Sequence, residues 1–173
     1  MKNLFRAAGW NRDLALASVA FDSALRCCDV LALRWDQMID TSGTIKTRVT
    51  IRQRKTGENV MFELSASTRA SLEDLAVRTG ARGYVFPGST PDTPLSGRQY
   101  RRLVKRWASL LGLPAEDYST HSLRRTKPSA VYQKTRDPEI VRILLGQRSL
   151  TATHRYLGLG QEEALAKARE VVI

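Results

Sequence analysis

The chain has 173 residues, of which 42% are hydrophobic and 26% are charged. This length supports one domain with a core of its own, and the composition is that of a soluble globular protein. No apolar run reaches the roughly 20 residues that a membrane-spanning helix needs. The N-terminal stretch MKNLFRAAGWNRD lacks the apolar segment of a signal peptide. We therefore expect a cytoplasmic protein without a membrane anchor.

Charge gives the first indication of a partner. Twenty-eight Lys and Arg residues against 17 Asp and Glu give a net charge of +11 and an isoelectric point near 10.3. Such an excess is expected of a nucleic-acid-binding protein, although a generally basic soluble protein would show it too. Cys27 and Cys28 are adjacent and cannot make an ordinary disulfide framework. With two histidines and no CxxC or HExxH spacing, the sequence predicts neither a metal site nor a cofactor.

In the first third of the chain, the sequence predicts two helices on either side of Arg26. Apolar residues recur at helical spacing over residues 11–25. A second helix is expected over residues 29–38, with Asp29 as its N-cap. Arg26 then lies at the junction between the two helices, where an arginine can also be no more than a favourable charge at a helix C-terminus.

A small antiparallel sheet is predicted next, over residues 43–65. Ile, Val and Thr alternate with polar residues there, and Thr56 and Gly57 mark a turn. Lys55 is therefore expected at the edge of a hairpin turn, where a lysine is normally solvated.

Two longer helices are predicted in the middle of the chain, over residues 65–80 and 98–112, with a loop rich in Pro and Gly at 86–97. In the second of them one face is expected to be apolar, with Leu103, Trp107, Leu110 and Leu111. Basic side chains lie largely off this stripe and are predicted to bind DNA phosphates, although a solvated face would look the same: Arg101, Arg102, Lys105 and Arg106.

The last third is predicted to be helical throughout. One helix begins in the stretch STHSLRRT at residues 119–126, and Pro128 is expected to kink it or to start a new one. Further helices are expected from the cap at Asp137 to Gly146, around Tyr156 up to Gly158, and over residues 160–172. The fold class is therefore α+β, mainly α-helical, with one small antiparallel β-sheet.

Residues that are ordinary alone gain weight in their order along the chain. An Arg at a helix junction, a Lys in a β-turn, a His-x-x-Arg pair on one helix face and a late Tyr together resemble the tyrosine recombinases, the phage-integrase family. The resemblance covers nearly the full length of the chain. It is carried by ALRCCDVLALRW around Arg26, RQRKTGE around Lys55, THSLRRT around His121 and Arg124, and LLGQRSLTATHRYLG around Gln147 and Tyr156.

This resemblance implies the tyrosine-recombinase catalytic-domain fold and transfer of DNA strands through a covalent 3′-phosphotyrosine, with double-stranded DNA as the partner. Tyr156 would attack the phosphodiester. Arg26 and Arg124 would neutralise the charge on the two non-bridging oxygens. Lys55 would be the general acid for the leaving 5′-oxygen, and His121 a general base for the tyrosine proton. The exchange conserves the bond energy, so it needs neither ATP nor metal.

Two further assignments follow from the same motifs. Asp29 matches an acidic residue thought to hold the family's pocket together, and as an N-cap it would instead be purely structural. Arg54 and Arg125 join the predicted DNA-binding residues.

The chain also departs from the family pattern. Gln147 stands where the family usually has a second histidine, or sometimes a tryptophan. Its amide can donate a hydrogen bond to a phosphate oxygen but cannot titrate. Only about one helix precedes Arg26, so residues 1–173 are expected to be the catalytic domain without a separate N-terminal core-binding domain. The chain is then either truncated or a natural minimal recombinase.

Three functions remain open at this point. The leading one is a site-specific recombinase or integrase that is monomeric in free solution and acts as a tetramer on two DNA sites. The expected helix over residues 160–172 favours it, because such tails dock onto the neighbouring subunit in this family. A type IB topoisomerase would use the same chemistry as a monomer. A DNA-binding regulator with the fold but weak or no catalysis is the third, and Gln147 is the feature that supports it.

Overall fold

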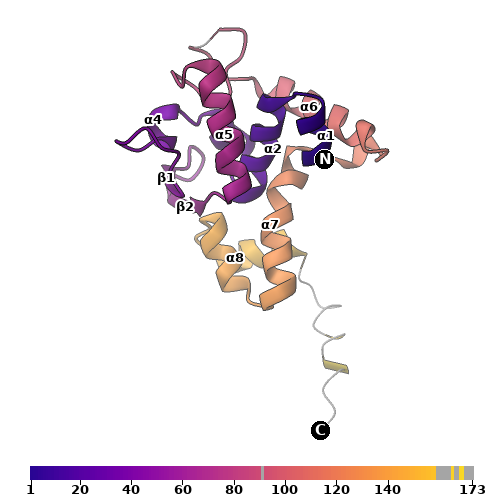
Figure 1. Ribbon diagram of the computed structural model, residues 1–173. Coiled ribbons are helices and arrows are strands. Elements are labelled where there is room, and N and C mark those ends of the chain that lie inside the picture. Colours follow the sequence, from indigo (N-terminus) through magenta and orange to yellow (C-terminus); the bar gives the residue numbers. More distant parts are fainter. Residues whose placement is uncertain (91, 159–164, 166–167, 170–173) are drawn as a thin grey trace. The chain divides into compact units, whose positions relative to one another are not determined.

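The structure is a computed structural model that describes residues 1–90, 92–158, 165, 168 and 169 (Figure 1). The chain divides into two compact units, Met1–Lys127 and Pro128–Ile173. The first unit contains α1 (Lys2–Ala7), α2 (Asn11–Ser23), α3 (Cys27–Leu31), α4 (Trp35–Met38), β1 (Arg48–Arg52), β2 (Asn59–Glu63), α5 (Ala66–Thr79), α6 (Gly97–Leu110) and the short 3₁₀ helix η1 (Ala115–Asp117). Helix α7 (Thr120–Thr135) begins in the first unit and ends in the second, which continues with α8 (Pro138–Leu145) and α9 (Leu150–Leu157).

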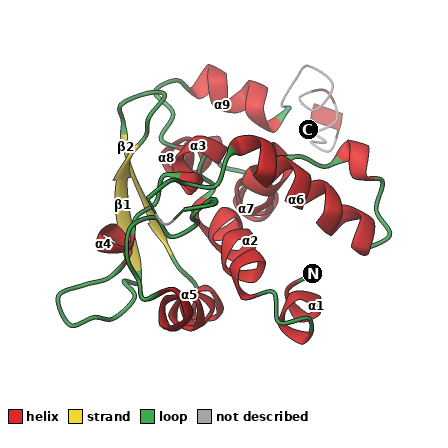
Figure 2. Cartoon of the chain, turned by 90° about the horizontal axis from the view of Figure 1, so that it is seen from above, coloured by secondary structure: helices red, strands yellow, loops and turns green. Residues whose placement is uncertain are grey.

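Helix α2 forms the centre of the core of the first unit. Every residue from Asp13 to Ala20 is buried, and α1, α5 and β2 pack against this helix (Figure 2). Asp13 is the one carboxylate in this buried stretch, and Trp107 of α6 donates to it over 2.9 Å from its indole Nε1. Phe5 of α1 packs against the same indole, with ring centroids 5.2 Å apart. The core therefore fixes the helix that leads to Arg26.

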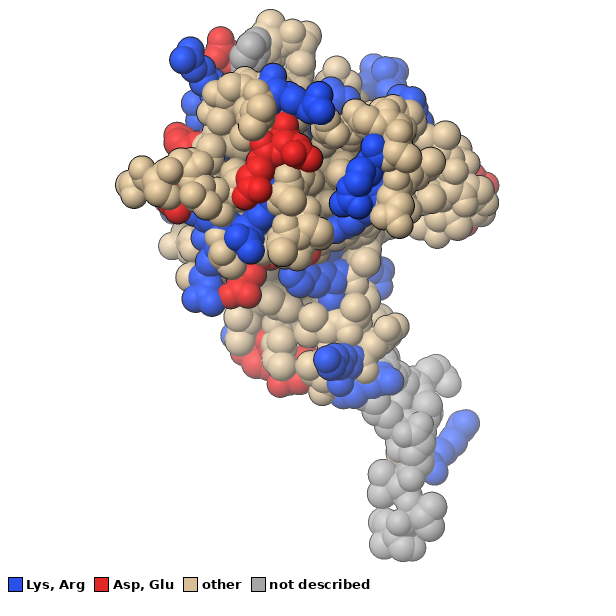
Figure 3. Space-filling model, in the orientation of Figure 1, with Lys and Arg blue, Asp and Glu red and all other residues tan. Residues whose placement is uncertain are grey.

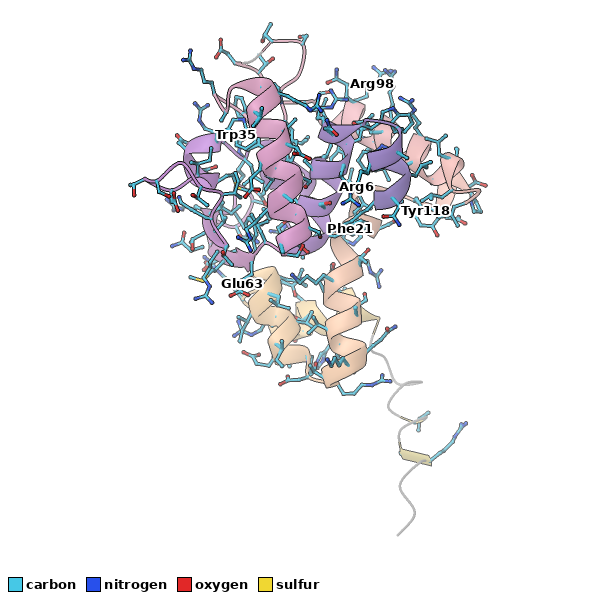
Figure 4. The ribbon with its side chains drawn as sticks, in the orientation of Figure 1. Arg6, Phe21, Trp35, Glu63, Arg98 and Tyr118 are labelled. Atoms are coloured by element: carbon cyan, nitrogen blue, oxygen red, sulfur yellow. The ribbon has the colours of Figure 1, made fainter. Side chains whose placement is uncertain are left out.

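The two strands form an antiparallel hairpin in which Arg48 pairs with Glu63 and Arg52 with Asn59. A slip of one residue would turn every buried side chain outward, so burial determines this register. Arg48 and Glu63, the latter labelled in Figure 4, also form an ion pair across the strands, with 2.5 Å between Nη2 and Oε1. The buried positions alternate with exposed ones, as the sequence predicted: Val49, Ile51, Val60 and Phe62.

The helix expected over residues 29–38 is in fact two short helices, α3 and α4. The backbone between them pairs instead with a distant segment. The carbonyl of Leu33 accepts from the N–H of Val85 at 2.9 Å, and the N–H of Trp35 donates to the carbonyl of Gly83 at 3.1 Å. A continuous helix would need these backbone groups for its own hydrogen bonds. The prediction was wrong because the groups pair instead with residues about 50 positions further along the chain.

The apolar face of α6 also differs from the expectation. The buried side chains are Tyr100, Val104, Trp107 and Ala108, whereas Leu110 and Leu111 are 47% and 39% exposed. The helix ends at Leu110 and Leu111 is its C-cap, so these two leucines do not continue the buried stripe. The prediction was correct for Trp107 and wrong for the last turn.

Helix α7 runs unbroken from Thr120 to Thr135, so Pro128 does not start a new helix. In the first unit this helix is attached to α2, because Nζ of Lys127 donates to the carbonyl of Asp22 at 3.1 Å. Because proline has no N–H, Pro128 cannot donate to the carbonyl of Arg124, four residues earlier in the helix.

The other predicted helix ends are confirmed. Ser65 caps α5 and Gly80 follows it, while Asp137 caps α8, which ends before Gly146 with a φ of +59°. Gly158 ends α9. The expected helix over residues 160–172 lies almost wholly outside the described residues. No helix that the structure describes has the length and apolar character to cross a bilayer.

Candidate active site

Arg26 lies on a three-residue link between α2 and α3. Ala24 ends α2 in the left-handed region, with a φ of +50° that is uncommon for a residue other than glycine. Arg26 itself is extended and is the N-cap of α3. Its carbonyl accepts from the N–H groups of Asp29 and Val30, both at 2.9 Å. The backbone on both sides of Arg26 is therefore held in place, at the helix junction where the sequence placed it.

The guanidinium of Arg26 is bound by a glutamine of the hairpin turn. Nη1 of Arg26 donates to Oε1 of Gln53, a side chain that is only 1% exposed. Sequence reasoning missed this residue. A signal was present, because Val49, Ile51 and Gln53 continue one inward-facing alternation, and a polar residue at the third position needs a buried partner.

Lys55 is exposed in the same turn, as predicted. Asp29 forms a hydrogen bond to the residue before it, Arg54. Oδ1 of Asp29 accepts from the backbone N–H of Arg54 at 2.9 Å. Asp29 is therefore not a helix N-cap, as one expectation had it. Arg26 takes that position, and Asp29 is buried in the first turn of α3. Its carboxylate contacts the turn that carries Lys55.

His121 and Arg124 lie one turn apart near the start of α7. Thr120, just before them, forms a side-chain hydrogen bond with Cys27, whose pKa is raised by burial. The start of α7 is thus next to the residue that follows Arg26. Arg124 is only 4% exposed. Partial burial lowers the pKa of His121, and the charges of Arg124 and Arg125 lower it further, which favours the neutral imidazole that can accept a proton.

Gln147 and Tyr156 belong to the second unit. Oε1 of Gln147 accepts from the hydroxyl of Thr153 at 2.6 Å, and its carbonyl accepts from Nη1 of Arg142 at 2.8 Å. Thr153 is fully buried and precedes the half-buried Tyr156 by one turn of α9. Gln147 therefore links the loop after α8 to the helix that carries Tyr156, and its amide N–H groups are not used in the bond to Thr153.

The structure thus brings the predicted residues together in two groups. In the first unit, hydrogen bonds connect Arg26 and Asp29 to the turn that carries Lys55. The Thr120–Cys27 contact places the start of α7 beside them. In the second unit, Thr153 connects Gln147 to the helix of Tyr156.

The basic residues predicted to bind DNA are spread over the first unit. Burial has the larger effect on the pKa of the Cys27 thiol, which it raises, but Arg101 of α6 lies close enough to Cys27 for its positive charge to lower that pKa. Arg106 is stacked on Trp10 at the start of α2, with its guanidinium carbon 4.4 Å from the ring centroid. The remaining members are exposed: Arg54, Arg102, Lys105 and Arg125. Arg101 is therefore placed near Arg26, and Arg106 near the opposite end of α2.

Positive charge does not cover the surface evenly. In the face that Figure 3 shows, acidic side chains gather over α5, which contributes the exposed Glu73 and Asp74. Basic side chains lie around this patch. The net charge of +11 therefore does not make this face a continuous surface for DNA phosphates.

Residues 1–163 match the model of the phage integrase family. The probable integrase/recombinase YoeC of Bacillus subtilis (strain 168) is 27% identical over 155 residues, which cover 90% of this chain and 82% of that protein. The tyrosine recombinase XerC of Thermodesulfovibrio yellowstonii is 27% identical over 154 residues, covering 84% of this chain and 49% of XerC. The chain thus spans about half the length of this XerC.

Solved structures show the same fold at lower identity. The XerH site-specific recombinase, bound to a palindromic difH substrate in a post-cleavage complex, superimposes with a TM-score of 0.75 at 20% identity, over 91% of this chain and 45% of that one. The XerA recombinase gives a TM-score of 0.74 at 17% identity, over 96% of this chain and 59% of that one. The fold class predicted from the sequence is confirmed.

Proposed function

The chain belongs to the phage integrase family, and from that membership we propose that it cuts and rejoins double-stranded DNA at specific sites, with Tyr156 as the nucleophile. One observation carries the proposal beyond family likeness. The hydrogen bond from Arg26 to the buried Gln53 and the bond from the backbone N–H of Arg54 to Asp29 hold a guanidinium beside the turn that carries Lys55. Cleavage of a phosphodiester uses both groups. The guanidinium stabilises the charge on the non-bridging oxygens, and the lysine ammonium gives a proton to the leaving oxygen.

In the cleavage step, Oη of Tyr156 attacks phosphorus and forms a new P–O bond while the bond to the 5′-oxygen breaks. The phenol proton passes to neutral His121, and the leaving 5′-oxygen takes a proton from the ammonium of Lys55. One proton is accepted and one is donated, so the step is balanced without another reactant. Rejoining reverses it, with a 5′-hydroxyl attacking the phosphotyrosine.

The two arginines stabilise negative charge and do not transfer protons. Arg26 and Arg124 place planar guanidinium donors on the non-bridging oxygens, whose negative charge grows as the bonds exchange. Gln147 would add a neutral amide donor to the same oxygens, because its bond to Thr153 uses the amide oxygen.

The wider setting of the reaction is part of the same proposal. The chain acts as a catalytic domain in the cytoplasm, is monomeric in free solution and assembles as a tetramer on two DNA sites. The XerH likeness, in which that protein is bound to difH DNA, and the charge of +11 support DNA as the substrate.

A nicked suicide duplex tests the proposal, because loss of the short strand beyond the nick traps the covalent intermediate. Duplexes tiled from the DNA next to the gene would be incubated with the chain and resolved on a denaturing gel. We expect a protein–DNA adduct with the parent chain and none with Tyr156→Phe, which should bind DNA equally well. An adduct that persists in Tyr156→Phe would overturn the assignment of the nucleophile. DNA binding without any adduct would favour a regulator, and relaxation of supercoils without site preference a topoisomerase.

A further inference from the structure

We propose that Gln53 is a positioning residue that sets the guanidinium of Arg26 and the turn of Lys55 relative to each other. The inference rests on the proposed function for its chemical meaning. The contacts behind it lie wholly within the first unit.

One buried oxygen contacts both sides of the arrangement. Oε1 of Gln53 accepts from Nη1 of Arg26 and from the hydroxyl of Thr56, the latter at 2.8 Å. Thr56 directly follows Lys55 in the turn. An amide oxygen has two lone pairs, so it can accept both bonds at once. A shift of the turn would therefore disturb the hydrogen bond that orients Arg26.

The backbone of Gln53 closes the same turn. Its N–H donates to the carbonyl of Glu58 at 2.8 Å, and its carbonyl accepts from the N–H of Gly57 at 2.9 Å. Gly57 has a φ of +71°, which favours glycine, and its own carbonyl accepts from Nε of Arg52 at 3.0 Å. The residue whose side chain holds Arg26 thus also closes the turn through both of its backbone hydrogen bonds.

A glutamine suits this position better than a carboxylate would. A neutral oxygen holds the guanidinium without offsetting the positive charge that a phosphate requires. The bond to Oε1 uses one of the five N–H donors of Arg26. Because Gln53 is 1% exposed, water cannot readily replace a lost bond, so its removal should be felt in full.

The first test does not depend on activity. Gln53→Met removes the acceptor oxygen at similar length and volume, and hydrogen exchange would be followed in the peptide covering residues 53–58. We expect roughly tenfold faster exchange in this turn, equivalent to about 1.4 kcal/mol. Gln99→Met is the matched control, since Gln99 caps α6 and contacts no proposed catalytic residue. It should leave the turn unchanged.

The second test separates chemistry from binding. On a suicide duplex that gives an adduct with the parent chain, single-turnover cleavage by Gln53→Met should fall by about 10²-fold, the order expected when one preorganised group is misplaced. The dissociation constant for the uncleaved duplex should change by less than about threefold, because affinity comes mainly from other phosphate contacts. Gln53→Glu keeps the acceptor but adds a charge, so it should protect the turn from exchange and still cleave more slowly than the parent.

A sulfur-substituted duplex assigns the loss to one side of the arrangement. With sulfur in place of the bridging 5′-oxygen, the leaving thiolate is far less basic and needs no proton from Lys55. Cleavage by Gln53→Met should therefore recover in part on this substrate, and the remaining deficit would belong to Arg26.

Several outcomes would overturn the proposal. They are cleavage by Gln53→Met at the parental rate, a loss explained wholly by weaker DNA binding, or unchanged exchange in the turn. If Gln53→Met does not fold, Thr56→Val removes one of the two donors from a partly exposed position and should slow cleavage severalfold. If the parent chain forms no adduct on any duplex, the proposed function fails, while the exchange measurement still decides whether Gln53 holds the turn.

Discussion

The two groups of predicted site residues are built differently. In the first unit, Arg26 and the Lys55 turn meet at a buried amide, and the strand before that turn belongs to the core. In the second unit, Tyr156 lies on an eight-residue helix, and the hydroxyl of Thr153 in this helix donates to Gln147. Stabilisation of charge requires groups fixed in advance, whereas a nucleophile must be able to approach phosphorus. The difference implies that substitutions in the first unit should change how well charge is stabilised, and substitutions in the second how the nucleophile is presented.

The largest expected effect is at Arg124, in the charge-stabilising group. Arg124→Ala should lower single-turnover cleavage by about 10²–10³-fold, with little change in DNA affinity, because its charge acts on the transition state. Arg124→Lys keeps the charge but not the planar guanidinium, so its cleavage rate should lie between those of the parent and of Arg124→Ala. Thermal melting of each variant would show whether this buried position still folds. Parental cleavage by Arg124→Ala would mean that the pocket is wrongly assigned.

Binding without catalysis is expected from the exposed face of α6. The double variant Arg101→Ala, Arg102→Ala should weaken binding about tenfold or more for all DNA sequences. The slope of log K against log salt concentration should become less steep by up to about 2. The double variant Arg12→Ala, Arg78→Ala is a control with the same loss of charge at the opposite end of α2. Affinity would be measured over a range of salt concentrations. Equal losses in the two double variants would show that net charge, and not the α6 face, determines binding.

Gln147 offers a smaller effect in the second unit. A histidine can donate to the phosphate as a cation, so Gln147→His should cleave faster, on the order of tenfold, and Gln147→Ala more slowly. Because Gln147 also accepts from Thr153, Thr153→Val separates loss of this link from loss of a phosphate contact. If Thr153→Val is as slow as Gln147→Ala, Gln147 acts by holding α9. Equal rates in all forms would mean that Gln147 does not contact the reacting phosphate.

The smallest effect concerns the pH dependence of cleavage. The pKa of His121 lies below its ordinary value of 6.5, and the protonated imidazole cannot accept the phenol proton. The rate should therefore hold at neutral pH and fall only as the pH drops below 6.5. Arg125→Gln removes a neighbouring positive charge, so the pKa should rise and the fall should begin less than about one pH unit higher. Arg98→Gln is the control, and a rate that does not decline in acid would exclude His121 as the base.

The features that the sequence predicted correctly are turns and helix ends, which depend on residues close together in the chain. Turn residues located Lys55, and helix caps located the ends of α8 and α9. It failed where distant segments compete for the same groups. The split between α3 and α4 depends on Leu33 and Trp35 pairing with residues 83–85, which no local pattern reveals. Gln53 was missed because a polar residue in a turn is normally solvated, and only the fold brings Arg26 to it.

Pro128 has a further consequence, for the cooperativity of unfolding. Helix α7 belongs to both units, yet it lacks the hydrogen bond that the N–H of residue 128 would give to the carbonyl of Arg124. Opening of the helix at this point is therefore less costly than elsewhere along it. We expect the unit that carries Tyr156 to unfold at a lower temperature than the unit that carries Arg26, as two calorimetric transitions. Pro128→Ala would supply the missing donor and should merge the two transitions into one.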